Sequence, residues 1–546
     1  MARRPSLLTY PLLRRRRLLP SDAAVSIIPA ERAQVGPARL THADNCRLSS
    51  RPDRDTLPGM DDVDQAPDQG PETIAALEAR LRRDLELLAQ PARDWVRART
   101  HPRHGAVLDV AIIGAGMAGL TAAFALMRLG VRNIRLFDRA PADLEGPWVT
   151  YARMETLRSP KHLAGPALGL PNLTFRAWFE ARFGREAWDR LGKIPRTQWM
   201  DYLRWYKRVL AIPVANETEM VDLAGDGHGL TVTLAAGGKT RPVAARRVVL
   251  ATGRDGLGGP YTPPIFRDLP THLCAHSGDA IDFASLAGKR IAVIGAGASA
   301  VDNAAEALEA GAAAVDMLVR RPDIPRINKG MGVSNPGLAL GFADLPPERK
   351  WAINAYVADC QTPPPRDSML RASRHETFAV HTACPILGVR AETDRVLLTT
   401  RLGETAFDFV ILGTGFVVDW PRRPELARLA PHIALWRDRY VDPDVPVHEF
   451  AEHPFLGARF EFTERVPGDA PWVGRVYCFN YAATMSQYKL TGDIPAISDG
   501  AVRLAEGIVR SLFVEDYADH YQRLLDYAQP ELLGDEWRRE EREDEA

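Results

Sequence analysis

The hydrophobic pattern of the chain becomes regular only after Met60. Residues 1–59 are rich in Arg, Pro and Ser and show neither helical nor strand periodicity, so we expect either a disordered extension or a segment upstream of a true start at Met60. Farther on, apolar residues recur at three- and four-residue spacing, at Ile74, Leu77, Leu81, Leu85 and Leu88. This spacing predicts an amphipathic helix whose apolar face packs on the body of the protein, with a dimer contact as the alternative.

A strand, a glycine-rich turn and a helix follow one another from Leu108 onward. The apolar run Leu108 to Ile113 enters Gly-Ala-Gly-Met-Ala-Gly, then an Ala- and Leu-rich helix, and a second strand that stops at Asp138. The first glycine permits a tight turn, the second lets the backbone approach a pyrophosphate, and the third lets helix and strand pack closely. The helix amino end favours an anion, and an acid at this spacing binds a ribose hydroxyl. The candidate dinucleotide-binding residues are Gly114, Gly116, Met117, Ala118, Gly119, Asp138 and Arg139.

The same unit occurs a second time along the chain. A strand ending at Ile294 enters Gly-Ala-Gly-Ala-Ser-Ala, and the next strand, Val315 to Val319, ends in two arginines instead of an acid. Arginine there can pair with a 2′-phosphate, which favours NADPH over NADH, although a solvated strand end is the alternative. The candidate residues of this second site are Gly295, Gly297, Ala298, Ser299, Ala300, Arg320 and Arg321.

Two apolar strands, Val248 to Gly253 and Phe409 to Gly415, each run into a small-Thr-Gly turn on either side of the second unit. They resemble the paired strands at the domain crossings of two-dinucleotide flavoproteins, and this resemblance adds Thr252, Gly253 and Gly415 to the cofactor site. The predicted fold class is α/β, with two Rossmann-like dinucleotide-binding domains and the NADPH domain inserted in the FAD domain. The expected regions are an N-terminal helix (60–104), the FAD domain (105–270, with a helical insertion at 145–210), the NADPH domain (271–400), the rest of the FAD domain (401–525) and a charged tail (526–546).

Further motifs resemble class B flavin-dependent monooxygenases, which include flavin-containing monooxygenases, Baeyer–Villiger monooxygenases and lysine/ornithine N-hydroxylases. The helix Arg196 to Trp205 is similar to the Arg-x-x-x-x-x-Tyr-Leu helix of that class, and Gly297-Ala-Ser-Ala-Val-Asp302 follows its Gly-x-Ser-x-x-(Asp/Glu) pattern. Trp148 follows Gly146 where the class carries Gly-Gly-x-Trp beside the flavin, but the glycine pair is not kept. The resemblance therefore implies FAD bound near Trp148.

The resemblance also supplies three candidate catalytic residues. His276 lies where the fingerprint of the class places a histidine, but Pro270 and His272 replace its Phe and Gly, which weakens a Baeyer–Villiger assignment. Asn480 and Asp493 fall in a segment that resembles the one pointing a helix amino end at the flavin. The alternatives are a surface histidine and an ordinary capped helix.

Composition narrows the functional classes. The 546 residues carry a net charge of −1 and 46% hydrophobic residues, so nucleic acid and an anionic membrane are not expected partners. The chain contains no apolar run of membrane-spanning length, and five scattered cysteines without a Cys-x-x-Cys pair favour a reducing cytoplasm. No metal site is expected.

The chemistry predicted from these features is that of an FAD-dependent, NADPH-using monooxygenase. We expect O2 and a small organic substrate to react through a peroxyflavin, since the cofactor carries the difficult step. An NADPH-dependent flavoprotein reductase of a non-disulfide acceptor is one alternative, and a non-catalytic nucleotide-binding sensor is another. The sequence is also compatible with a homodimer.

Overall fold

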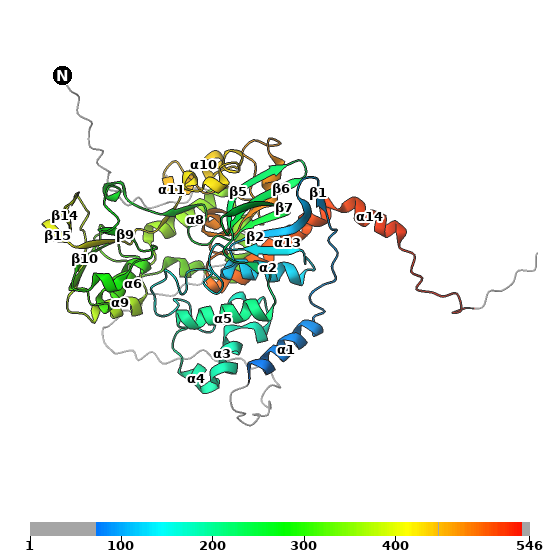
Figure 1. The fold of residues 1–546 in the computed structure, drawn as a ribbon, viewed down its shortest axis with the longest axis horizontal. Coiled ribbons are helices and arrows are strands. Elements are labelled where there is room, and N and C mark those ends of the chain that lie inside the picture. Colours follow the sequence, from blue (N-terminus) through cyan, green and yellow to red (C-terminus); the bar gives the residue numbers. More distant parts are fainter. Residues whose placement is uncertain (1–72, 446, 538–546) are drawn as a thin grey trace, which may run out of the picture. The chain divides into compact units, whose positions relative to one another are not determined.

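A computed structural model describes residues 73–445 and 447–537, which lie within one compact unit, Asp68–Ala546. The expectation for residues 1–59 therefore lies outside the described residues. Two large β-sheets organise this unit, each with helices packed on it (Figure 1). Within the described residues, no helix has the length and apolar character needed to cross a membrane.

The larger sheet contains the first predicted nucleotide unit. Its strands run in the order β4 (Val214–Ala215), β3 (Ile134–Phe137), β2 (Gly105–Ile113), β7 (Lys239–Leu250), β6 (Gly229–Ala236) and β5 (Glu219–Asp226), with β1 (Thr100–His101) paired to β2 and β18 (Val476–Cys478) paired to β7. The strands β4, β3, β2, β7 and β18 are parallel, whereas β7, β6 and β5 form an antiparallel meander. Helices α2 (Met117–Arg128) and α13 (Ile497–Glu515) pack against each other beside it.

The second sheet is entirely parallel, as expected for a buried nucleotide-binding unit. Its strands run in the order β12 (Phe378–His381), β11 (Ala314–Leu318), β10 (Arg290–Ile294), β16 (Phe409–Leu412) and β9 (Cys274–His276), and α6 (Ala298–Glu309) follows β10. All five strands fall between β7 and β18 in the sequence, so this sheet is inserted in the first. The predicted fold class is thereby confirmed, while the domain boundaries stay predictions.

The chain passes between the two sheets twice, and these two crossings pair in a short antiparallel ladder of β8 (Gly258–Pro260) and β17 (Phe416–Val418). β17 directly follows Gly415 of the second small-Thr-Gly turn, and β8 begins five positions after Gly253 of the first. The pairing brings the ends of β7 and β16 together, although they are far apart in the sequence. Residues after both turns therefore lie at one site.

Four helices carry the amphipathic and aromatic patterns of the first half of the chain: α1 (Ile74–Leu87), α3 (Phe175–Phe183), α4 (Arg185–Arg190) and α5 (Arg196–Val209). Leu77 and Leu81 of α1 are fully buried in the main core, as their spacing predicts. Because the body covers this face of α1, it does not supply the alternative dimer contact. A homodimer stays a prediction.

The remaining regular elements surround the two sheets or extend from them. They are the antiparallel sheet β13 (Gly388–Ala391), β14 (Val396–Thr400) and β15 (Gly403–Phe407), and helices α7 (Pro336–Gly341), α8 (Pro347–Cys360), α9 (Arg366–Ser373), α10 (Trp436–Arg439), α11 (His448–Ala451), α12 (Thr484–Gln487) and α14 (Tyr517–Asp526).

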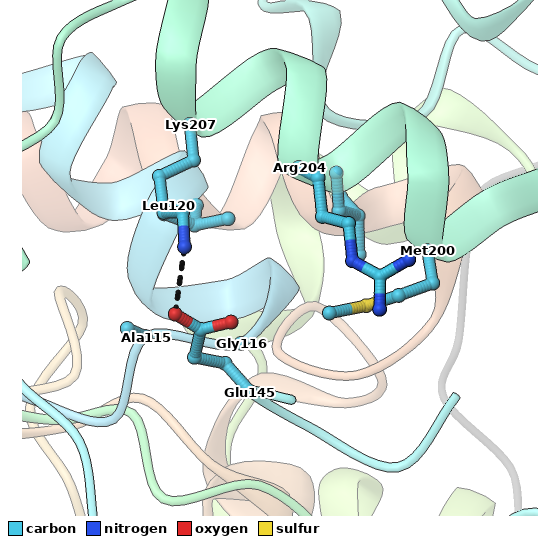
Figure 2. A pocket seen from close by; sticks show the side chains of 8 residues that line it. Ala115, Gly116, Leu120, Glu145, Met200, Arg204 and Lys207 are labelled. Carbon is cyan, nitrogen blue, oxygen red and sulfur yellow. Dashed lines mark hydrogen bonds and ion pairs between the residues drawn. The ribbon is translucent and has the colours of Figure 1, made fainter. Parts of the chain in front are cut away.

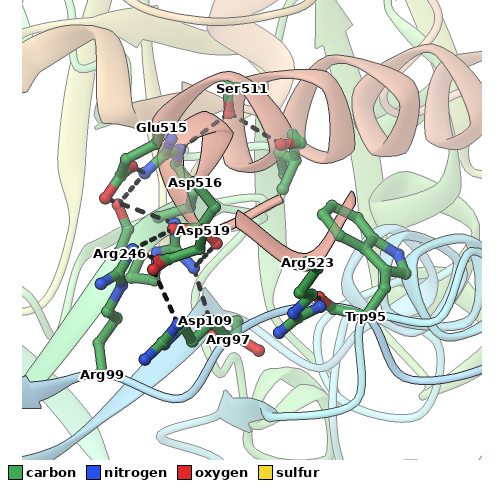
Figure 3. Close-up of polar contacts among 12 residues, drawn as sticks. Trp95, Arg97, Arg99, Asp109, Arg246, Ser511, Glu515, Asp516, Asp519 and Arg523 are labelled. Atoms are coloured by element: carbon green, nitrogen blue, oxygen red, sulfur yellow. Dashed lines mark hydrogen bonds and ion pairs between the residues drawn. The ribbon is translucent and has the colours of Figure 1, made fainter. Parts of the chain in front are cut away.

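A buried ionic network joins the large sheet to the C-terminal helices (Figure 3). Arg246 of β7 donates two hydrogen bonds, of 2.8 and 2.9 Å, to Asp516 between α13 and α14, and both side chains are almost fully buried. Arg99 reaches Asp516 from the N-terminal side at 2.5 Å. The oxygen Oδ1 of Asp109 lies 4.0 Å from Arg246 and has no hydrogen-bond partner among the residues that the structure describes.

Asp109 makes the unfolding free energy depend on pH. Burial raises the pKa of Asp109 to about 7, against the attraction of Arg246, whereas an unfolded aspartate titrates near ~3.9. The folded state therefore holds the extra proton between these values, and stability falls as pH rises through this window. We expect Asp109→Asn to remove this dependence, so that its stability relative to wild type grows by ~2 kcal/mol between about pH 5 and 7. Urea denaturation of both proteins across this range checks this dependence, with Asp189→Asn at an exposed position as control. Parallel pH profiles of wild type and Asp109→Asn would contradict it.

Candidate functional site

The glycine-rich turn at Gly114 is packed so closely against neighbouring backbone that side chains do not fit at two of its positions. Gly114 has φ +102°, and a Cβ there would lie 2.4 Å from the carbonyl oxygen of Ala251. A Cβ on Gly119 would lie 1.9 Å from the carbonyl oxygen of Gly114. Gly116 is the N-cap of α2 and has no side chain to cap the first amides of the helix. These residues fit the pyrophosphate of a dinucleotide at the helix amino end.

Asp138 fixes this turn from the end of β3. One carboxylate oxygen accepts a 2.7 Å hydrogen bond from the amide of Ala115, and the other accepts a 2.8 Å bond from the amide of Ala140. Each oxygen keeps a second lone pair, so the arrangement is compatible with the predicted ribose contact. The adjacent Arg139 is exposed and lies 3.5 Å from Asp255.

A small pocket lies beside the turn, bordered by α5 (Figure 2). Glu145 is buried there and accepts 2.8 Å hydrogen bonds from Lys207 and Asn216. Sequence reasoning missed this trio, because its members come from three separate segments and match no local motif. A buried carboxylate requires such partners, so the pairing holds the loop before Trp148 against α5.

The predicted Trp148 segment is brought beside the first turn. A Cβ on Gly116 would lie 3.7 Å from Gly146 Cα, two residues before this tryptophan. The Trp148 ring meets Trp199 edge-on at 6.2 Å, and its carbonyl accepts a 2.7 Å hydrogen bond from Arg196 of the predicted helix. Its Nε1 has no partner among the described residues.

The second turn has the same construction. Gly295 has φ +111°, and a Cβ there would lie 2.6 Å from the carbonyl oxygen of Gly413. A Cβ on Gly413 would in turn lie 2.4 Å from Cβ of Ala300. Ala300 thus stands in the third glycine position because the facing residue is itself a glycine. Gly297, Ala298 and Ser299 form the start of α6, as predicted.

The two arginines after β11 differ in their surroundings. Arg321 donates a 2.8 Å hydrogen bond to the carbonyl of Asp359. Arg320 is exposed and makes no hydrogen bond or ion pair with any residue that the structure describes. Arg320 is therefore the freer of the two cations at this strand end.

Asn480 joins the end of β18 to the end of β7. Its amide donates to the carbonyl of Leu250 at 3.1 Å and to Thr252 Oγ1 at 3.2 Å, and its oxygen accepts from the amide of Ala482. Thr252 and Gly253 are positioned by these bonds and by the amide of Tyr481, which donates to Gly253. Asn480 therefore positions the turn that follows β7. Its predicted catalytic role stays a prediction.

His276 and Asp493 lie at the edges of the region after the two crossings. Burial lowers the pKa of His276, so its imidazole is neutral; Nδ1 accepts from the amide of Gly278, and the ring packs edge-on against Phe416, next to Gly415. Burial raises the pKa of Asp493, against the attraction of Lys489, Arg254 and Arg158. Their catalytic roles also stay predictions.

Arg254 lies between these candidates, and no sequence motif pointed to it. Its guanidinium lies 4.5 Å from the Tyr481 ring centroid and 6.0 Å from that of Phe416, so it spans both crossings. The side chain is exposed and makes no hydrogen bond or ion pair within the described part of the chain. Arg254 therefore places a cation close to Asp493 and to the segments of Asn480 and His276.

Comparison with known proteins identifies the family. The family model described as pyridine nucleotide-disulphide oxidoreductase matches residues 111–334. The FAD-dependent urate hydroxylase of Xanthomonas campestris pv. campestris is 42% identical over 469 residues, covering 85% of this chain and 98% of the relative. The chain belongs to the FAD-dependent monooxygenases.

More distant relatives agree with this placement. The FAD-containing monooxygenase EthA of Mycolicibacterium smegmatis is 27% identical over 223 residues, covering 39% of this monooxygenase and 42% of EthA. The ornithine hydroxylase of Pseudomonas aeruginosa shares the fold, with a TM-score of 0.60 and 16% identity over 74% of this chain and 100% of that structure.

Membership in this family confirms the predicted oxidoreductase class and the use of FAD, a pyridine nucleotide, O2 and a small substrate. When bound, FAD supplies the redox chemistry, and the protein binds it, orients the reactants and excludes water. The cysteines that the structure describes, Cys274, Cys360, Cys384 and Cys478, are all free. Disulfide chemistry therefore has no paired thiols in this part of the chain.

Proposed function

We propose that this monooxygenase takes its reducing equivalents from NADPH. Arg320 carries the proposal, since it lies after β11 at the position where nicotinamide-binding units meet the adenosine ribose and has no partner among the residues described. A guanidinium there pairs with a 2′-phosphate, and it would gain nothing from the 2′-hydroxyl of NADH.

Removing this charge tests the coenzyme preference. We expect Arg320→Ala to raise the KM for NADPH about tenfold and to leave the KM for NADH unchanged, because one charge-assisted contact is lost. Steady-state oxidation of each coenzyme measures both values. Arg190→Ala is the control, because Arg190 pairs only with Glu186 on the surface of α4. An equal change for both coenzymes would contradict the proposal.

We further propose that the substrate is urate or a closely related oxidised purine, which the enzyme hydroxylates. The 42% identity to the urate hydroxylase, extending over nearly all of that protein, carries this proposal. The cations Arg158, Arg254 and Lys489 around Asp493 suit an oxygen-rich, anionic substrate. The reaction consumes urate, O2, NADPH and one proton, and it yields hydroxylated urate, NADP+ and water.

Stoichiometry tests this substrate. Purified holoenzyme with NADPH and urate should consume one O2 and one NADPH for each urate lost, with little hydrogen peroxide formed. Xanthine and a small amine serve as comparison substrates. Oxygen uptake that urate does not stimulate, or that yields only peroxide, would overturn the assignment.

A further inference from the structure

Three polar side chains lie close to Gly330. A methyl group on Gly330 would lie 3.2 Å from Tyr488 Oη, 3.5 Å from Asn328 Oδ1 and 3.8 Å from Lys489 Nζ. Gly330 is buried, and it follows the second nucleotide unit in the sequence, whereas Tyr488 and Lys489 precede Asp493. A phenol, an amide oxygen and an ammonium group from two distant segments thus lie close to one buried glycine.

These polar groups are not satisfied by the protein. Tyr488 Oη and Asn328 Oδ1 are closed to solvent and have no hydrogen-bond partner among the described residues. Lys489 is half-buried and has no ion pair in that part of the chain, although it lies 5.7 Å from the Tyr488 ring. Leaving a buried donor and a buried acceptor unpaired is costly, and each such group needs an explanation. A ligand that offers both an acceptor and a donor would remove the cost.

The backbone at Tyr488 is held in a conformation that favours glycine. Its φ is +55° and its ψ is −148°, and its amide donates a 2.8 Å hydrogen bond to the carbonyl of Thr484. The ring packs against Phe342 at 5.3 Å. Such strain persists where the surrounding structure enforces it, and it concentrates at ligand-binding sites. Here it accompanies a phenol oxygen placed beside Gly330.

We propose that Asn328, Tyr488 and Lys489 form the subsite that recognises the polar edge of a planar, anionic heterocycle. This inference rests on the proposed function, and it names the residues that recognise the proposed substrate. Tyr488 and Lys489 donate to the ring oxygens, while Asn328 Oδ1 accepts from a ring N–H.

Tyr488→Phe tests the subsite, because it removes only the phenol oxygen. We expect the dissociation constant for urate, measured by perturbation of the flavin spectrum, to rise about tenfold. The dissociation constant for FAD should stay within about twofold, and the thermal midpoint without urate should stay equal or rise, because a buried unpaired hydroxyl is removed. Gly330→Ala should weaken urate binding as well. Tyr356→Phe, at an exposed position of α8, is the matched control.

The outcomes separate this inference from the choice of substrate. Weaker FAD binding, a lower thermal midpoint or unchanged ligand affinity in Tyr488→Phe would overturn the subsite. If wild type binds xanthine but not urate, and the variants weaken xanthine binding, the urate assignment fails and the subsite stands. If the flavin of wild type responds to neither purine, both proposals fall.

Discussion

Replacing Gly119 with alanine is expected to give a protein that purifies without its flavin. The added Cβ would lie 1.9 Å from the carbonyl oxygen of Gly114, so α2 must move away from β2 to accommodate it. Overpacking of this kind costs ~3 kcal/mol, and the amides at the start of α2 no longer converge on the pyrophosphate. We expect the dissociation constant for FAD to rise about a hundredfold, which corresponds to ~3 kcal/mol.

Flavin content after purification and titration of the apoprotein with FAD measure this loss. Gly192→Ala is the matched control, since a Cβ there meets nothing within 4 Å. Far-ultraviolet circular dichroism shows whether the variant is folded. If folding fails, Asp138→Asn gives a milder test, because it weakens the bonds to Ala115 and Ala140 without adding volume. A folded Gly119→Ala protein that retains wild-type flavin would contradict the assignment of this turn.

Sequence alone predicted both nucleotide-binding units because their determinants are local. The strand Ile134–Phe137 ends directly before Asp138, as predicted, and the strand predicted at Val315 to Val319 is shifted by one residue. Close contact of backbone with backbone requires glycine within a few positions, so it leaves a readable spacing. The insertion of one unit in the other was readable because two similar strands flank the second unit.

The polar side chains of the site could not be predicted from the sequence, because they come together from distant segments. Arg254 faces Tyr481 and Phe416, and no spacing rule connects these three positions. Tyr488 becomes a candidate only in the structure, where its phenol oxygen is buried and has no hydrogen-bond partner among the described residues. Ala300 shows the same limit, since its tolerance depends on a glycine more than a hundred positions away. Sequence motifs locate the cofactors; tertiary contacts decide which side chains meet the substrate.

Replacing Asp516 with alanine is expected to lower the free energy of unfolding by ~3–5 kcal/mol, because it leaves the buried Arg246 without its main partner. Among the described residues, Glu515 at 3.5 Å and Asp109 at 4.0 Å would be the remaining acids near that guanidinium. Burial alone would raise the pKa of Asp516, but the hydrogen bonds from Arg246 and Arg99 hold it below its usual value. The contribution is therefore present above about pH 4, and it is lost as pH falls through the lowered pKa.

Urea denaturation at neutral pH measures the loss, and Asp519→Ala supplies the matched control. Asp519 pairs with Arg97 and Arg99 at the surface, where such pairs contribute ~1 kcal/mol or less. The double variant Arg246→Met, Asp516→Leu should recover much of the loss, because it removes both buried charges together. Equal losses in Asp516→Ala and Asp519→Ala would show that the buried contact contributes no more than a surface pair. No recovery in the double variant would show that the loss does not come from an unpaired buried charge on Arg246. Recovery would show that the loss in Asp516→Ala comes from leaving the buried charge of Arg246 without a partner.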